Sequence, residues 1–303
     1  MIQNLPAAFF KNVTQAFPPD GERWLNDLPD LLDEAARRWE LKLDLDEIFP
    51  LSYNYVCAAT RADGTPVILK VGVPNRELTS EINALRLYAG QGACRLLEAD
   101  AGKGMLLEER ALPGTPLATL KDDDQATGIA AEVMLKIQRP VNEPEKFLSL
   151  RDWFDKLKEL RPRFGGTTGP FPEKNIARVE ELTRALFAEN RKEVLLHGDF
   201  HHDNILLAGR GWLVIDPKGV IGPAEYEVGP FLMNPWGKLP EEASAVRRTR
   251  RRIVILSERL GVDRERLQAW AICHSVLSAY WDLAEDGTGG EYSRAWTEIF
   301  LEA

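Results

Sequence analysis

The chain has 303 residues, which corresponds to about two ordinary domains or to one large domain with two lobes. Hydrophobic residues make up 44% and charged residues 28%, as is typical of folded globular proteins and unlike disordered or fibrous chains. The formal net charge of −9 opposes broad attraction to nucleic acid or to anionic membranes.

Signals for membrane insertion or export are not apparent in the sequence. No apolar run approaches the ~18 residues of a membrane span, and the N-terminus lacks a basic segment followed by an apolar one. We therefore expect a cytoplasmic protein that has neither nucleic acid nor a membrane as partner.

The first part of the chain is predicted to be helical as far as residue 48. Trp24, Leu28, Leu32 and Ala35 recur at the spacing that places side chains on one face of a helix. We expect residues 1–48 to form a helical extension of the first lobe.

The next part of the chain is rich in β-formers. Two such runs, residues 53–60 and 66–71, are separated by Asp63-Gly64, which is a strong signal for a hairpin turn. Residues 75–90 show helical periodicity and end at a glycine. Two further strands are predicted at residues 94–99 and 104–108. The pattern predicts a small, mostly antiparallel sheet that carries one helix.

The segment ALPGTPL at residues 111–117 is the best candidate for a lobe boundary, because two prolines and a glycine interrupt the pattern there. The chain beyond it is chiefly helical, apart from a β-rich island at 194–215. That island divides into short strands around a tight turn at 209–211. The fold class is therefore α+β, with a sheet-containing first lobe and a helical second lobe that carries a short β-hairpin.

The cysteines and an arginine-rich run are expected to have structural rather than catalytic or binding roles. The three cysteines, Cys57, Cys94 and Cys273, are scattered and lack CxxC spacing, so we expect buried apolar side chains rather than disulfides or metal ligands. The run RRTRRR at 247–252 lies in a helical pattern whose apolar stripe includes Ile253, and we expect its arginines to form a solvated face.

The stretch LLHGDFHHDNILL at 195–207 has the residues that phosphoryl transfer requires. Such a reaction needs a carboxylate to accept the hydroxyl proton, and an amide with a second carboxylate to hold Mg²⁺. Asp199 and Asn204 are separated by four residues, as in the protein-kinase pattern, and a short hairpin leads on to Asp216. The sequence predicts that these three side chains meet at one end of the loop.

The same pattern requires a lysine on an upstream strand and a glutamate on the next helix. Lys70 ends the run PVILK, and the following helix offers Glu77 or Glu81. Either acid is compatible with the sequence, and we prefer Glu81.

These motifs together resemble a known family. HGDFHHDNILL is similar to the HGDxxxxNxL signature of aminoglycoside phosphotransferases, antibiotic kinases with the two-lobed protein-kinase fold. VILKVG, SEINALRLY, WLVIDPKGVIGPAEYEVGPFLMNP and CHSVLSAYWDLAEDG most resemble the streptomycin 6-kinase and hydroxyurea kinase branch, over about residues 50 to 290. The resemblance implies a nucleotide-binding lobe at 1–109 and, at 110–303, a lobe with the catalytic loop and the acceptor site.

Roles at the catalytic centre are implied by this resemblance. Asp199 would be the catalytic base, Asn204 and Asp216 would bind Mg²⁺, and Lys70 would hold the phosphates of ATP while paired with Glu81. His197 would hold the shape of the loop.

Two parts of the nucleotide site are implied less directly. The backbone of Leu107, Glu108 and Glu109 would bind adenine as the hinge between the lobes. The sequence before Lys70 has no GxGxxG motif, so the loop that covers the phosphates must use backbone amides and Ser52.

The acceptor predicted from the resemblance is a cationic, streptomycin-like aminoglycoside, whose phosphorylation at the 6-position would confer antibiotic resistance. Carboxylates attract such a molecule. Candidate acids in the second lobe are Glu225, Glu227, Asp282, Glu285 and Asp286.

Several other functions remain compatible with the sequence. The acceptor could be a sugar, an amino alcohol or hydroxyurea. His197, His201 and His202 resemble the ligand clusters of metal-dependent hydrolases, although such sites usually gather histidines from distant segments and only His274 remains. A nucleotide-binding pseudokinase would be favoured by substitution of one of the catalytic residues, and none is substituted.

Overall fold

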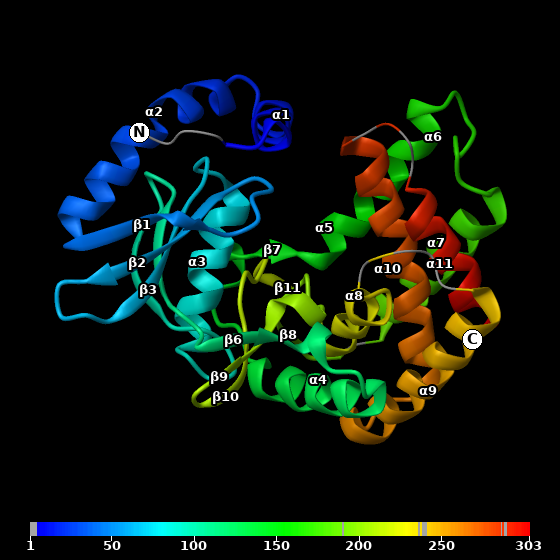
Figure 1. The fold of residues 1–303 in the computed structure, drawn as a ribbon. Coiled ribbons are helices and arrows are strands. Elements are labelled where there is room, and N and C mark those ends of the chain that lie inside the picture. The colour runs from blue at the N-terminus through cyan, green and yellow to red at the C-terminus, as the bar shows by residue number, and fades with distance from the viewer. Residues whose placement is uncertain (1–4, 190, 236, 238–240, 286, 288–289) are drawn as a thin grey trace.

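The computed structural model contains two lobes, one around a five-stranded sheet and a larger one that is mostly helical (Figure 1). The α+β fold class and the two-lobed architecture are thus confirmed. The residues that the structure describes are 5–189, 191–235, 237, 241–285, 287 and 290–303.

The elements of the first lobe are α1 (Ala7–Ala16), α2 (Asp20–Arg38), β1 (Leu41–Ile48), β2 (Tyr55–Arg61), β3 (Pro66–Val71), α3 (Arg76–Tyr88), β4 (Leu96–Asp100) and β5 (Met105–Glu109). The strands of the second lobe are β6 (Pro113–Pro116), β7 (Leu148–Ser149), β8 (Glu193–Leu196), β9 (Ile205–Ala208), β10 (Gly211–Val214) and β11 (Val220–Pro223). Its α-helices are α4 (Asp123–Ile137), α5 (Leu150–Asp155), α6 (Leu160–Arg163), α7 (Glu173–Ala188), α8 (Val228–Leu232), α9 (Glu242–Leu260), α10 (Arg264–Glu285) and α11 (Glu291–Glu302). Short 3-10 segments are η1 (Leu117–Thr119), η2 (Pro144–Lys146), η3 (Lys156–Glu159), η4 (His202–Asn204) and η5 (Ala224–Glu227).

The sheet of the first lobe has the order β1-β2-β3-β5-β4, and its neighbouring strands are antiparallel. Alternation along β3 separates its two faces. Val67, Leu69 and Val71 pack into a core with α1 and α2, whereas Lys70 points to the other side of the sheet, where α3 lies. The N-terminal helices therefore cover one face and leave the opposite face to the site.

The prediction that residues 1–48 are helical is wrong for the last part of that segment. Residues 41–48 form β1, which pairs with β2. The signal was present in the sequence, because Leu41, Leu43 and Leu45 alternate with Lys42 and Asp44 at the period of a strand. The strand makes residues 49–54 a connection between two antiparallel neighbours.

The second lobe is built on a large apolar core that includes Trp270, Leu277 and Trp296, none of which is exposed. Two three-stranded sheets lie between this core and the first lobe, in the orders β10-β9-β6 and β7-β11-β8. The loop from β8 to β9 carries the predicted catalytic residues. A bridge between Ala93 and Val214 connects the hairpin of β9 and β10 to the first lobe.

Two predictions about side-chain environment have different outcomes. Cys57, Cys94 and Cys273 are buried free thiols, as expected. The expectation of a fully solvated arginine face is wrong at Arg252, which is 1% exposed and bonds to Asp123. Arg252 turns inward because this carboxylate of α4 and the carbonyl of Asn234, 2.6 Å away, satisfy its guanidinium.

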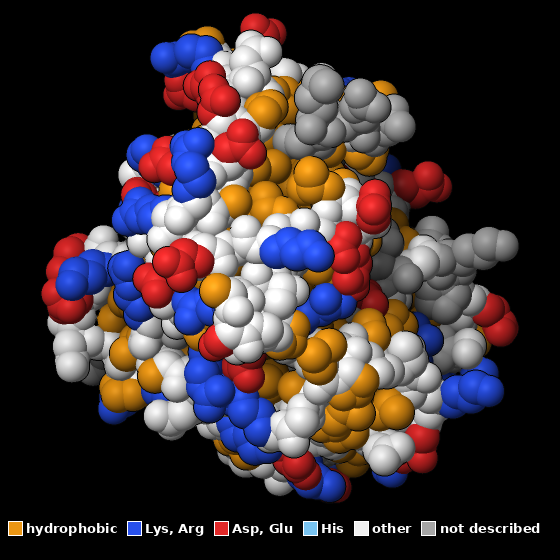
Figure 2. Space-filling model, turned by 60° about the vertical axis from the view of Figure 1, so that its left-hand side comes forward, with side chains coloured by type: hydrophobic (Ala, Val, Ile, Leu, Met, Phe, Trp, Pro, Cys, Tyr) orange, Lys and Arg blue, Asp and Glu red, His pale blue; other side chains and the backbone are white. Residues whose placement is uncertain are grey.

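The surface carries charges of both signs, and the described helices are unlike membrane spans. On the face shown in Figure 2, basic and acidic side chains are interspersed around hydrophobic areas. Among the helices in the described part of the chain, none combines the length and the apolar character that crossing a membrane requires.

Candidate active site

The catalytic loop depends on a buried histidine and a glycine. Gly198 has a φ of +84°, and an added Cβ would lie 2.8 Å from Val220 and 3.1 Å from Trp153. The neighbouring His197 donates from Nε2 to the Ile215 carbonyl at 2.8 Å, and its Nδ1 accepts from the Asp199 N–H at 3.2 Å. Burial lowers the pKa of His197 to about 4, so the ring is neutral and both nitrogens are engaged.

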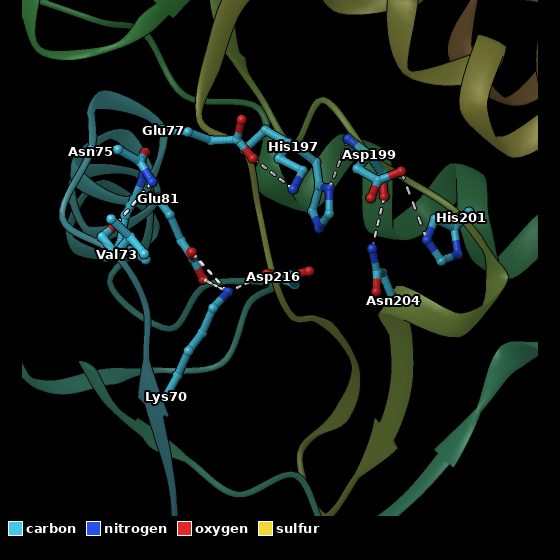
Figure 3. Close-up of polar contacts among 12 residues, drawn as sticks. Lys70, Val73, Asn75, Glu77, Glu81, His197, Asp199, His201, Asn204 and Asp216 are labelled. Atoms are coloured by element: carbon cyan, nitrogen blue, oxygen red, sulfur yellow. Dashed lines mark hydrogen bonds and ion pairs between the residues drawn. The ribbon is translucent and has the colours of Figure 1, made fainter. Parts of the chain in front are cut away.

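Asp199 and Asn204 lie in the β8–β9 connection and Asp216 in the β10–β11 connection, and Figure 3 shows Asp216 between Lys70 and the contacting pair of Asp199 and Asn204. The Asn204 amide donates to the Asp199 carbonyl at 3.0 Å, and the Asp199 carboxylate lies 3.7 Å from His201 Nε2 with 41% of its side chain exposed. Asp216 has a φ of +58°, a conformation that non-glycine residues rarely adopt and that concentrates at functional sites.

Lys70 connects these residues to the first lobe. Its ammonium lies 2.6 and 2.8 Å from the two carboxylate oxygens of Glu81 and also pairs with Asp216. Glu77, the alternative that the sequence left open, pairs instead with Lys218. The preferred Lys70–Glu81 pair is therefore the one that forms.

Electrostatics in the pocket are dominated by several acids that share one lysine. Lys70 lowers the pKa of Asp216, and the carboxylates around Lys70 raise the pKa of its ammonium against the effect of burial. Burial raises the pKa of Glu81 to about 8 and that of Glu108 to about 7. The acids around Lys70 therefore oppose one another's ionisation, and a further cation would stabilise their charged forms.

The residues present fit Mg²⁺. Asn204 and Asp216 offer carboxamide and carboxylate oxygens, the hard ligands that Mg²⁺ prefers, and the surplus of carboxylates favours a divalent cation.

The histidine cluster does not form the metal site of a hydrolase. His201 Nδ1 accepts from the Asp203 N–H at 3.2 Å, and His202 is 2% exposed and stacks on Phe231 at 4.3 Å. His197 is held as described above. Across residues 5–303, apart from the few undescribed positions, no three His, Cys, Asp or Glu side chains gather as metal ligands.

Leu107, Glu108 and Glu109, the predicted hinge, are the last three residues of β5. β5 lies between β3 and β4, and the backbone of these residues pairs with both strands. The Glu109 N–H donates to the Arg95 carbonyl at 2.9 Å, and the Leu107 side chain packs into the core under α2. The adenine-binding role of residues 107–109 stays a prediction.

Ser52 lies in the 49–54 connection between β1 and β2. Its carbonyl accepts from Asn12 of α1 at 3.3 Å, and the ring of the next residue, Tyr53, lies 6.5 Å from that of Phe17. The N-terminal helices thus support this connection from outside the sheet.

Residues 38–287 match the family model described as aminoglycoside/hydroxyurea antibiotic resistance kinase. The chain belongs to this kinase family. The resemblance predicted from the motifs is confirmed, and the enzyme is a small-molecule phosphotransferase.

Two relatives show how far the similarity of this kinase extends. It is 30% identical to the streptomycin 6-kinase of Streptomyces glaucescens over 288 residues, which are 95% of this chain and 93% of the relative. It is 32% identical to the hydroxyurea phosphotransferase of Kitasatospora aureofaciens over 270 residues, 88% of this chain and 76% of the relative.

Solved structures support the fold of the kinase. The aminoglycoside phosphotransferase APH(4)-Ia matches with a TM-score of 0.63 at 16% identity, covering 92% of this chain and 99% of that one. The choline kinase LicA from Streptococcus pneumoniae matches with a TM-score of 0.62 at 14% identity, covering 91% and 98%.

The acids predicted for the acceptor site have different environments in this kinase. Glu225 is 6% exposed and pairs with Arg191 at 2.8 Å and with Arg266 at 3.1 Å. Glu227 is 3% exposed and accepts from the Gly198 N–H at 3.2 Å, below the catalytic loop. These contacts occupy Glu225 and bury Glu227, so neither offers a free charge to an acceptor.

The acids near the end of α10 stay open as acceptor residues. Asp282 is half-buried and accepts from the Ser293 hydroxyl at 2.9 Å. The side chains of Glu285 and Asp286 lie outside the described part of the structure.

Lys218 is a charged residue at the site that the motifs did not indicate. It follows Asp216 by two residues, and its ammonium lies 2.8 Å from Glu77 of α3. The sequence signal was the segment DPKG, which begins with the predicted metal ligand Asp216 and has a lysine two residues after it.

Proposed function

We propose that this kinase transfers the γ-phosphoryl group of ATP to a hydroxyl of a streptomycin-like aminoglycoside, at the 6-position, with Mg²⁺ as cofactor. The observation that carries the proposal is the meeting of Asp216 from the second lobe with the Lys70–Glu81 pair of the first. This arrangement provides a cation and metal ligands from opposite sides of the cleft, as phosphoryl transfer requires.

Each residue has a specific task in this reaction. Asp199 orients the acceptor hydroxyl and accepts its proton, and Lys70, held by Glu81, binds the α- and β-phosphates. Asn204 and Asp216 would hold Mg²⁺, which neutralises charge on the phosphates when bound. The exposed 41% of the Asp199 side chain leaves room for the acceptor to approach.

Two further segments contact the nucleotide: residues 107–112, at the end of β5 and after it, and the connection between β1 and β2. The peptide groups of 107–112 bind adenine, because this segment joins the sheet of the first lobe to the second lobe. The connection that contains Ser52 covers the phosphates, since it links the two strands nearest the edge of the sheet.

A cationic acceptor fits the acids that are left at the end of α10. Asp282 is one such residue, and Glu285 and Asp286 follow it in the chain. The similarity to a streptomycin 6-kinase over 95% of this chain supports the choice of acceptor, and carboxylates at the cleft would raise the encounter rate with a cation.

Hydroxyurea is the second candidate acceptor, because the chain is 32% identical to a hydroxyurea phosphotransferase. ADP release should be measured by a coupled assay with streptomycin, other aminoglycosides, hydroxyurea, a sugar and an amino alcohol, and the product located by mass spectrometry and NMR. Turnover with streptomycin and phosphate at its 6-hydroxyl is expected. Turnover confined to another acceptor would overturn the aminoglycoside assignment but not the kinase reaction.

A further inference from the structure

The backbone of Lys218 contacts the loop that carries Asp199. Its N–H donates to the His197 carbonyl at 2.7 Å, and its Cβ packs against Gly198, where an added Cβ would lie 3.1 Å away. The residue between Lys218 and Asp216 is Pro217, whose ring restricts the backbone. The base of the Lys218 side chain is therefore fixed relative to Asp199 and Asp216.

The ammonium of Lys218 reaches across the cleft to the other lobe. It lies 2.8 Å from the carboxylate of Glu77, in the first turn of α3. The Glu77 side chain is 53% exposed and that of Lys218 is 30% exposed. Figure 3 shows the Glu77 carboxylate directed toward the loop that carries His197 and Asp199.

The surroundings of Lys218 are acidic. Glu77 lies 2.8 Å from its ammonium, and Asp216 precedes it by two residues. Lys70, the other lysine at this site, is already shared by Glu81 and Asp216. Lys218 thus carries its positive charge next to both the predicted base and a predicted metal ligand.

The pair with Glu77 is a contact that Lys218 can exchange. An ion pair with a half-exposed carboxylate is weak, because water screens it and both long side chains lose freedom. A phosphate oxygen carries more charge and forms stronger charge-assisted hydrogen bonds. A nucleotide between the lobes would therefore compete successfully with Glu77.

We propose that Lys218 is a catalytic residue that leaves Glu77 and binds the transferred phosphoryl group. This inference rests on the proposed function. The phosphorus–oxygen bond to ADP breaks, a bond to the acceptor oxygen forms, and the acceptor proton passes to Asp199. Lys218 keeps its protons throughout and stabilises the negative charge of the phosphoryl oxygens in the transition state.

The first test needs no acceptor. Isothermal titration with the non-hydrolysable ATP analogue AMP-PNP and with ADP, both with Mg²⁺, should be compared between wild type and Lys218→Met. Loss of a charged contact to the terminal phosphate weakens AMP-PNP binding by about tenfold, with little change for ADP. Equal weakening of both nucleotides, or of neither, would show that Lys218 does not bind the terminal phosphate.

Three further variants separate this role from a structural one. Glu77→Gln removes the competing carboxylate, so this variant should bind AMP-PNP at least as tightly as wild type does. If the ion pair had only a structural role, both Glu77→Gln and Lys218→Met would bind AMP-PNP more weakly. Lys218→Arg should restore most of the preference for AMP-PNP. Lys103→Met, which removes an ammonium 2.5 Å from Glu34, is the matched control and should bind both nucleotides as wild type does.

Turnover provides the second test. With an accepted substrate, Lys218→Met should lower kcat by about 10²-fold while the acceptor KM changes little, because the contact strengthens in the transition state. Unchanged kcat would overturn the catalytic role. If the wild type phosphorylates none of the acceptors, the proposed function fails, and the nucleotide titrations still decide where Lys218 binds.

Discussion

Asp216 is one of the residues through which the two lobes contact each other. It ends the β10 hairpin in a left-handed conformation and contacts Lys70 from the first lobe. A non-glycine residue is held in this conformation only when its surroundings compensate the strain, and here the charge of Lys70 does so. Geometry and electrostatics therefore both point to Asp216 as a residue retained for function.

Substitution of Asp199 and Asp216, the two acids proposed to act in the reaction, should reduce turnover without unfolding the protein. Asp199→Asn removes proton acceptance, and we expect kcat to fall by about 10²–10⁴-fold, since general base catalysis contributes that much. Asp216→Ala should lower kcat at least as far, because it removes a metal ligand. Initial rates with circular dichroism as a check on folding measure both effects.

Asp203→Asn is the matched control for these variants. Asp203 belongs to the same loop, and 54% of its side chain is exposed, with His201 3.8 Å away. Its kcat should stay within about twofold of wild type. A loss as large as that of Asp199→Asn would mean that any charge change disturbs the loop.

Glu227 makes stability depend on pH. Burial raises the pKa of its carboxyl to about 8, and its Oε2 has no hydrogen-bond partner among the described residues. Between pH 4.5, the ordinary pKa of a glutamate, and pH 8, the carboxyl is protonated in the folded state but ionised in the unfolded chain. The free energy of unfolding is therefore highest below about pH 4.5 and falls as the pH rises toward 8.

Glu227→Gln should abolish this pH-dependent loss. The variant should gain on the order of 1–4 kcal/mol relative to wild type between pH 5 and pH 8.5. Chemical denaturation at a series of pH values gives the difference directly. A difference in stability that is the same at both pH values would show that Glu227 is ionised in the fold.

The burial of Arg252 could not be predicted from the local sequence pattern. Its neighbours Arg250 and Arg251 are exposed, as the sequence pattern predicts. Arg252 is buried because Asp123, 129 residues away, lies next to it in the fold. The burial of a charge depends on a partner that the local sequence does not contain.

Among the elements, α2 determines how one face of the first sheet is covered. Its apolar side chains pack on β3 and β5, and the hydrophobic effect holds them there. The helix itself was predictable, because the helical spacing of Trp24, Leu28 and Ala35 is unambiguous. The helical prediction is wrong for β1, because the sequence there alternates at the period of a strand.

Leu28→Ala should reveal the contribution of α2 to stability. Leu28 is fully buried, so its truncation should lower the free energy of unfolding by about 2–5 kcal/mol. Asp27→Ala on the exposed side of the same helix is the control and should change it by less than about 0.5 kcal/mol. Urea denaturation measures both, and equal effects would mean that α2 does not pack on the sheet in solution.

Strand prediction succeeded where the local sequence and its turn residues give a signal and failed at β6 and β7, where they do not. β2, β3 and the β9–β10 hairpin follow patterns of local sequence and turn residues. β7 has two residues and β6 contains two prolines, so neither has a strand signal of its own. They become strands because β11 and β9 offer edges to pair with.

For the whole molecule, polar contacts connect the two lobes around the cleft. Besides the lysine pairs, the Ser80 hydroxyl donates to the Gly219 carbonyl, and Arg210 donates to Glu109 at 2.6 Å. Apolar side chains join the lobes as well, since Ala84, Tyr88 and Ala93 of the first lobe are buried in the core of the second. A ligand bound between the lobes would add contacts to both.

A nucleotide with Mg²⁺ should therefore stabilise the whole protein. At a concentration 100 times the dissociation constant, AMP-PNP should add about 2.7 kcal/mol and raise Tm by several degrees. The increase should require the metal and should be much smaller in Asp216→Ala than in Asp203→Asn. Thermal unfolding with EDTA or Mg²⁺ tests this, and an equal shift in the absence of metal would contradict the assigned role of Asp216.

The amino-acid sequence by itself predicted the fold class from the periodicity of its segments, and the resemblance of its motifs predicted the family and the roles of Asp199, Asn204 and Lys70. Only the tertiary structure decided that Glu81 rather than Glu77 pairs with Lys70, that Glu225 is occupied by arginines, and that Lys218 faces the cleft. These properties depend on contacts between residues far apart in the chain, where burial and the nearest opposite charge decide what a side chain does.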